Sequence, residues 1–148
     1  MASLYPLKLG LLFFWAAWFS IVFLTNVFSA LKASGRLAPD WRFASRNYEM
    51  VCKAVAPYGA PPWVPRLLFL GVLVWQLLAA TLFWFALAAS GGSGVLDMAA
   101  VNAASAAGIL LWAAFMIADE ITIRYAVEQP HELLFVAQLA SLVVMHLL

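Results

Sequence analysis

The stretch of sequence that decides the fold, MAAVNAASAAGILLWAAFMIADEITIRYA, spans residues 98–126. It is an apolar segment, rich in small side chains, that ends in a burst of charged residues. An α-helix rises about 1.5 Å per residue, so about 20 residues cross the hydrocarbon core of a bilayer. A helix that enters the bilayer at the start of this stretch leaves it near Ile117. We therefore predict that Asp119, Glu120 and Arg124 lie at a membrane boundary.

The composition of the whole chain is that of a membrane protein. Of its 148 residues, 66% are hydrophobic and 10% are charged, and the mean hydropathy is +0.96. Soluble domains carry about 25% charged residues. The net charge of +1 provides no basic face for nucleic acid. The single cysteine, Cys52, excludes an internal disulfide and a cysteine-based zinc or iron-sulfur site.

Four apolar segments predict an all-α membrane protein, a single domain built as a four-transmembrane-helix bundle. The predicted spans cover about residues 7–31, 64–89, 98–118 and 132–148. The first apolar run is longer than the hydrophobic region of a signal peptide, so we expect a retained span. A glycine-rich turn before Asp97 joins the second and third spans as antiparallel neighbours, and Asp97 is expected to cap the third helix. Pro130 is expected to break the chain near Gln129, so that the fourth span starts at Glu132.

The long connection between the first two spans contains an amphipathic pattern over residues 41–55. Its less polar positions recur at helical spacing, and they are Trp41, Ala44, Tyr48, Val51, Cys52 and Val55. We predict an interfacial helix here, with Asp40 as its N-cap and a favourable pair between Glu49 and Lys53. Two locations remain open, the headgroup layer and the end of the bundle itself.

Lysine and arginine counts predict the orientation. The connection between spans one and two, with its flanks, and the connection between spans three and four hold seven basic residues, whereas the other side has only Lys8. The positive-inside rule then places both larger connections in the cytoplasm and both termini on the outer side. We expect a bacterial cytoplasmic membrane.

Four polar residues within or at the ends of the spans form a candidate intramembrane cluster, namely Asn26, Gln76, Gln138 and Asp119. Polar side chains in hydrocarbon usually face the bundle interior and bond across helices. Two interpretations follow. The residues hold the helices together, or they line a cavity for a quinone headgroup, a lipid or another small ligand. No cofactor is predicted, although a bound lipid, quinone or pigment is compatible with the second interpretation.

The charges after the third span have helical spacing. Glu120, Arg124 and Glu128 lie at i, i+4 and i+8, which predicts a salt-bridge ladder along one face of a helical extension. A metal site built on Glu128 and His131 is not supported, because a proline lies between them and no second such pair exists. His146 has no histidine partner at its depth for a haem.

Aromatic residues surround much of the first span, and we take four of them as candidate partner-facing residues: Trp15, Trp18, Phe19 and Phe23. Rings in such number exceed what a small bundle is expected to bury, so they contact lipid, another protein or a pigment. The third span has two registers of small residues at every fourth position, which allow close helix packing: Ala99, Ala103, Ala107, and Ala100, Ala104, Gly108.

Three stretches resemble, in the same order, a bacterial family of predicted small integral membrane proteins of unknown function. They are FLTNVF (23–28), WQLLAATL (75–82) and GILLWAAFMIADE (108–120). The resemblance implies four spans and no assigned activity.

Two classes of function fit these features. The first is an accessory subunit of a larger membrane complex, respiratory or photosynthetic for example, whose partners are other integral membrane subunits. The second is a protein that binds or transports a small ligand through the polar cluster. An enzyme is the least supported class, because the sequence has no nucleophile-base-acid arrangement, phosphate loop or dinucleotide fingerprint.

Overall fold

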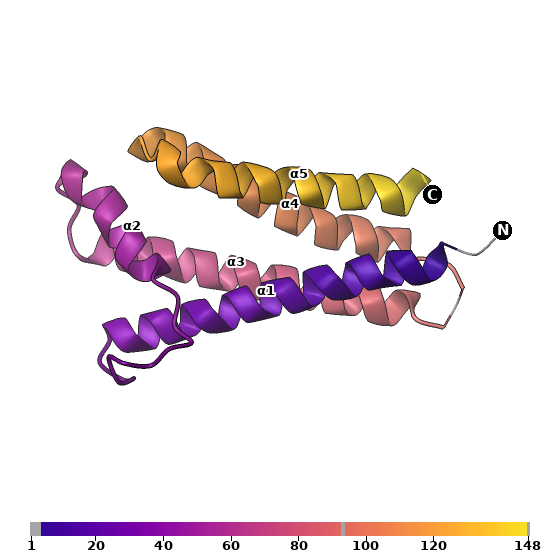
Figure 1. The fold of residues 1–148 in the computed structure, drawn as a ribbon, viewed down its shortest axis with the longest axis horizontal. Helices are drawn as coiled ribbons and strands as arrows, with labels where there is room; N and C mark the ends of the chain where they lie inside the picture. Colours follow the sequence, from indigo (N-terminus) through magenta and orange to yellow (C-terminus); the bar gives the residue numbers. More distant parts are fainter. Residues whose placement is uncertain (1–3, 93, 148) are drawn as a thin grey trace.

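The structure, a computed structural model, describes residues 4–92 and 94–147, and for residues 125–127 it describes the backbone alone. Four long helices form a bundle (Figure 1). They are α1 (Tyr5–Ala33), α3 (Trp63–Ser90), α4 (Met98–Thr122) and α5 (Tyr125–Leu147). All four contain segments long and apolar enough to cross a membrane. The predicted four-helix fold is confirmed, and the chain is a multi-pass integral membrane protein.

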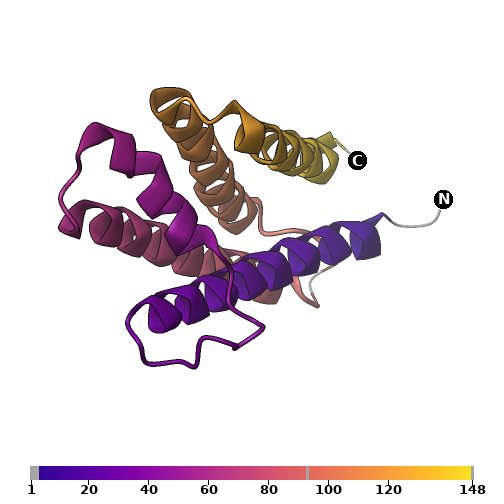
Figure 2. The ribbon, with the colours of Figure 1, turned by 60° about the vertical axis from the view of Figure 1, so that its left-hand side comes forward.

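The long helices pack as two pairs. Helix α1 lies along α3, and α4 lies along α5, while α3 and α4 join the two pairs. Helices α1 and α5 have little contact with each other. Figures 1 and 2 show that the pairs diverge toward the end that carries the short helix α2 (Asn47–Val55), whereas both termini lie at the opposite end. We refer to these as the α2 end and the terminal end.

Small residues allow close packing on the buried side of α4. Ala100, Ala104 and Gly108 are buried on one face of α4, and the indole N–H of Trp75 on α3 donates to the Ala107 carbonyl at 2.9 Å. This register of small residues is therefore confirmed as a packing face. The other register is not, because Ala99 and Ala103 are exposed. The Asp97 cap is also confirmed, since its carboxylate accepts from the Ala100 N–H at 3.0 Å.

The amphipathic helix begins later than predicted. Helix α2 starts at Asn47, its N-cap is Arg46 rather than Asp40, and the 3-10 turn Ala56–Tyr58 follows it. Residues 41–46 are instead held against α1, where the Trp41 ring packs on Phe28 with centroids 5.8 Å apart and the Ser45 N–H donates to the Thr25 carbonyl at 3.0 Å. Tertiary contacts therefore override the helical pattern there. Helix α2 packs over the ends of α1 and α3, which is the second of the two expected locations.

The turn between α4 and α5 also differs from the prediction. Helix α4 ends in a Schellman motif, in which the Ile123 N–H donates to the Glu120 carbonyl and the Arg124 N–H to the Asp119 carbonyl. Ile123 adopts the left-handed conformation, with φ of 54°, and so reverses the chain. Helix α5 then begins before Pro130, which lies inside the helix and does not break it. A proline in a bundle helix is tolerated when neighbouring groups compensate for its missing donor.

Candidate functional site

The polar residues predicted to cluster lie in separate hydrogen-bonded groups. The first group surrounds Asn26, whose side chain is fully buried on α1. Its amide N–H donates to Gln76 Oε1 on α3 at 2.9 Å, and its Oδ1 accepts from Ser45 Oγ at 2.5 Å and from Asn47 Nδ2 at 2.8 Å. One carboxamide thus joins α1, α3 and the start of α2. The predicted proximity of Asn26 and Gln76 is found.

The second group lies between α4 and α5. Gln138 is 1% exposed, and its Oε1 accepts from the Trp112 indole N–H at 2.7 Å. Its amide packs directly on Gly108, whose missing side chain provides the space. Within the described part of the chain, Gln138 Nε2 has no hydrogen-bond partner, and the same holds for the nearby buried hydroxyl of Ser105. Gln138 therefore does not join the Asn26 group.

The third group is an acid-histidine pair at the α2 end. Asp119 Oδ2 lies 2.5 Å from His131 Nδ1, and Asp119 is 7% exposed. The His131 ring packs on Phe115, with centroids 4.9 Å apart, and lies nearly parallel to Trp112 at 6.5 Å. Asp119 points into the bundle, as expected for a polar side chain of the candidate cluster. Its partner is His131, not Asn26 or Gln138.

Sequence analysis did not pair these two residues because the turn between the helices was placed wrongly. With a break at Gln129, His131 would precede the fourth span. The Schellman turn at Ile123 instead starts α5 at Tyr125, so that His131 faces back toward α4. Across residues 4–92 and 94–147, no group of three or more His, Cys, Asp or Glu side chains is arranged to hold a metal ion.

The predicted salt-bridge ladder is wrong. Glu120 and Glu128 belong to different helices, and the turn between them reverses the chain direction. The spacing that would stack these carboxylates with Arg124 holds only within one continuous helix. Arg124 Nη1 instead donates to the Met50 carbonyl on α2 at 3.3 Å. The Arg124 side chain thus ties the α4–α5 turn to α2.

Two of the four candidate partner-facing aromatic residues are in the core. Trp15 and Phe19 are 2% and 0% exposed, and Phe19 stacks between Phe83 at 5.7 Å and Trp112 at 5.6 Å. The Trp15 indole N–H also donates to Ser141 Oγ at 3.1 Å and so links α1 to α5. The prediction underestimated how many rings the bundle can bury, because the alanines of α3 and α4 leave room for them. The other two, Trp18 and Phe23, are half-buried.

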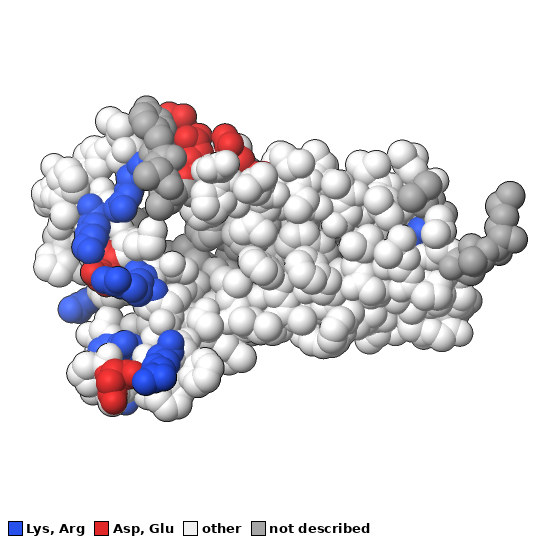
Figure 3. All heavy atoms as spheres, in the orientation of Figure 1, with Lys and Arg blue, Asp and Glu red and all other residues white. Residues whose placement is uncertain are grey.

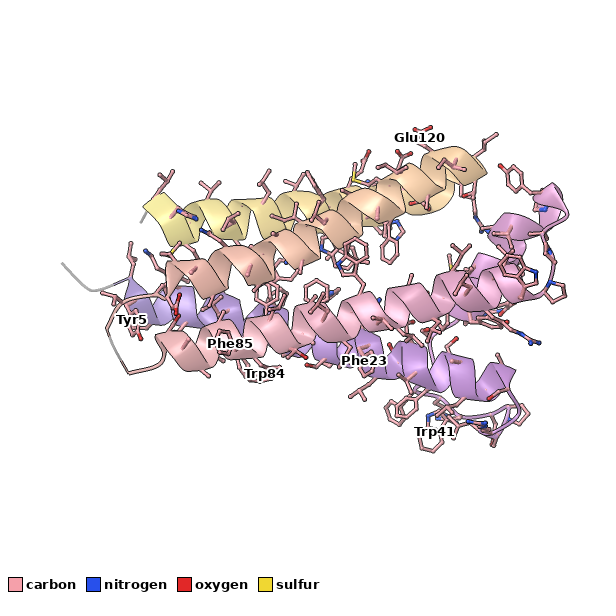
Figure 4. The ribbon with its side chains drawn as sticks, turned by 180° about the vertical axis from the view of Figure 1, so that it is seen from behind. Tyr5, Phe23, Trp41, Trp84, Phe85 and Glu120 are labelled. Atoms are coloured by element: carbon pink, nitrogen blue, oxygen red, sulfur yellow. The ribbon has the colours of Figure 1, made fainter. Side chains whose placement is uncertain are left out.

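Three other exposed rings lie on the outer side of α1 and α3. We call Phe13, Trp84 and Phe85 the aromatic platform; their exposed fractions are 54%, 43% and 60%. Phe13 meets Trp84 edge to face with centroids 5.9 Å apart, and the Trp84 indole N–H donates to Ser20 Oγ at 3.0 Å. Figure 4 shows Trp84 and Phe85 on α3, in the half of the bundle toward the terminal end. In the sequence, Phe13 and the α3 rings were recognisable only as part of the high aromatic content of the spans.

Charged residues gather at the α2 end (Figure 3). Helix α2 and the segments that flank it carry most of the basic residues, and the acidic residues lie mainly over the α4–α5 turn. On α2, Glu49 bonds Lys53 at 2.7 Å and Arg46 at 3.2 Å. The hydrogen bond from Lys53, together with Arg46, lowers the pKa of the Glu49 carboxyl to about 2. Glu49 is therefore ionised throughout the physiological range.

Chemically, the described polar groups bind helices to one another. Asn26, Gln76, Gln138 and Asp119 all use side-chain oxygens or amides in bonds within the bundle. Such interhelical bonds contribute about 0.6–2 kcal/mol each in a membrane. Comparisons of the chain with family models, curated proteins and solved structures found no match. Functional inference therefore rests on the geometry alone.

Proposed function

We propose that this protein is an accessory subunit of a larger membrane complex and stabilises its neighbours without catalysis of its own. The observation that carries the proposal is the aromatic platform. Phe13 lies eight residues after the start of α1 and Trp84 six residues before the end of α3, so both lie about 10 Å inside the terminal end of the bundle. Exposed rings on the outer side of a membrane helix contact either lipid or the helices of a neighbouring protein.

Trp84 of the platform is also held in place by hydrogen bonds. The Ser20 hydroxyl accepts from the Trp84 indole and itself donates to the Ala16 carbonyl at 2.7 Å, so the ring is tied to the backbone of α1. An exposed ring that is fixed before binding loses little conformational entropy when another helix packs on it. Its polar N–H is also satisfied within the chain, which leaves an apolar outer surface. These properties favour contact with another protein over contact with fluid lipid.

The ligand-binding alternative has less support. It needs Asn26, Gln76, Gln138 and Asp119 to share one cavity, whereas they belong to three separate hydrogen-bonded groups. In the orientation we propose, the basic α2 end faces the cytoplasm of a bacterial cell and both termini face outward. Tags at either terminus that were accessible only from the cytoplasm would contradict this orientation.

Photocross-linking in native membranes tests the subunit proposal. A benzophenone amino acid replaces Phe85, and the control replaces Val143, which is 46% exposed on α5 and lies at a similar distance from the terminal end. We expect a discrete adduct with another membrane protein from position 85 and none from position 143. Changing Phe13 and Trp84 together to leucine should reduce co-purification of that protein. Equal cross-linking from both positions, or migration of the chain alone in mild detergent, would refute the proposal.

A further inference from the structure

A pocket of about 370 Å³ opens at the α2 end, between the last turn of α1 and the first turns of α3. On the α3 side it is lined by Arg66, Leu70 and Leu73, with Phe69 beneath them. In chain order, Arg66, Phe69, Leu70 and Leu73 lie at i, i+3, i+4 and i+7, so they share one face of the helix. Arg66 is at the outer end of this face, and Leu73 lies about 10 Å deeper along the helix axis. The pocket therefore has a cationic mouth and an apolar floor.

The α1 side of the pocket is made of small residues. Ala30, Ala33 and Ser34 share a face at i, i+3 and i+4, and their short side chains leave the space that forms the pocket. Ser34 donates its hydroxyl to the Leu31 carbonyl at 3.0 Å, so its oxygen remains available as an acceptor. The α1 wall thus adds no bulk and no charge, and Arg66 is the charged residue of the lining.

Tyr48 of α2 forms the third wall. Its ring meets Phe69 edge to face with centroids 5.3 Å apart, and its backbone N–H donates to Ser29 Oγ at 3.4 Å. Phe69 is 2% exposed, so the ring that supports Tyr48 is itself fixed. The pocket is consequently formed by three helices whose relative positions are set by packing.

The electrostatics favour an anion. Residues 32–66 carry six basic and two acidic side chains. Two of the basic residues, Arg46 and Lys53, bond Glu49, whereas Arg66 makes no ion pair or side-chain hydrogen bond with the other described residues. A guanidinium offers five N–H donors in a planar fork that matches phosphate oxygens. At a membrane boundary each basic residue strengthens the attraction to anionic lipid.

We propose that this pocket binds one anionic phospholipid. Arg66 binds the headgroup phosphate at the membrane boundary, and an acyl chain lies over Leu70 and Leu73. Leu70 is 55% exposed, so the apolar floor opens toward the surrounding lipid rather than into a closed cavity. A soluble anion would use Arg66 but would leave this floor uncovered. The lipid fills both parts of the site.

Native mass spectrometry of the full chain in mild detergent tests the headgroup contact. The probes are phosphatidylglycerol and phosphatidylcholine, which have the same acyl chains and differ in net charge. We expect the wild-type protein to retain one phosphatidylglycerol in preference to phosphatidylcholine. Arg66→Gln should reduce this retention about fivefold. The matched control Arg42→Gln removes an exposed arginine outside the pocket and should leave retention unchanged.

A second pair of variants tests the acyl contact. Leu73→Trp fills the floor of the pocket and should lower phosphatidylglycerol retention, whereas Leu77→Trp, one turn further along α3 and outside the lining, should not. Water-soluble glycerol phosphate should not displace the lipid. The proposal is overturned if the wild type retains no lipid, if each variant behaves like its control, or if glycerol phosphate competes as well as phosphatidylglycerol does.

Discussion

Replacement of Gly108 by alanine tests the packing of the bundle core. A Cβ built on Gly108 would lie 2.6 Å from the amide carbon of Gln138 and closer still to its nitrogen. Real Cβ atoms do not approach other heavy atoms this closely, so Gln138 must move. Gln138 is 1% exposed and accepts the Trp112 indole N–H, so the displacement that a Cβ requires weakens or breaks that bond. We expect G108A to destabilise the contact between α4 and α5.

Three effects set the magnitude. Overpacking a well-filled core costs about 1–3 kcal/mol, and loss of the bond from Trp112 to Gln138 adds about 0.6–1.7 kcal/mol. The higher helix propensity of alanine returns at most about 1 kcal/mol. The free energy of unfolding should therefore fall by about 1–4 kcal/mol.

Reversible unfolding by sodium dodecyl sulfate in mixed micelles measures this loss. The matched control is Gly71→Ala on α3, where an added Cβ meets nothing within 4 Å. With no steric cost, the higher helix propensity of alanine should raise its unfolding free energy by up to about 1 kcal/mol. In a Gln138→Ala background the glutamine side chain that the new Cβ would meet is absent, so G108A should lower the unfolding free energy much less there. The packing argument is refuted if G108A costs no more than G71A, or costs the same with and without Gln138.

Three further predictions concern single positions. Asn26→Leu leaves the partners of a fully buried amide unpaired, so it should lower the unfolding free energy by about 1–3 kcal/mol and speed trypsin cleavage at Arg46. Ile123 is a β-branched residue in the left-handed conformation and is 68% exposed, so Ile123→Gly removes backbone strain and loses little packing. It should raise the free energy of thermal unfolding by about 1 kcal/mol, whereas the β-branched replacement Ile123→Val should not. The lowered pKa of Glu49, about 2, means that its pairing stabilises α2 above about pH 4.5 and is lost as the pH falls toward 2. Carboxyl NMR titration should find this pKa, and Lys53→Met should raise it.

Local sequence signals, namely the length of the apolar runs and the capping residues, were enough to predict the membrane spans and the start of α4. All four spans were recognisable because apolar runs of bilayer length are rare in other proteins. Asp97 was recognisable as a cap because it directly precedes the apolar run of α4. The start of α2 was not, because Trp41 and Ser45 contact α1 rather than continuing the helical pattern.

The residues that face the core were harder to predict. A helix that is apolar on all sides carries no hydropathy signal that separates its lipid-facing side from its packed side. Trp15 and Phe19 were therefore assigned to the surface, although the structure buries both. The carboxamides were correctly placed inside, because a polar group in hydrocarbon needs a partner, but their grouping depended on helix rotation and pairing.

The sequence by itself determined the class of the protein, because a bilayer demands long apolar segments with internally bonded backbones. It also determined that the basic residues gather beyond the ends of the spans. Only the tertiary structure decided that His131 pairs with Asp119, because that contact follows from the left-handed residue Ile123. Only the tertiary structure, likewise, placed Arg66 above an apolar floor, because the pocket arises where the small residues of α1 face α3.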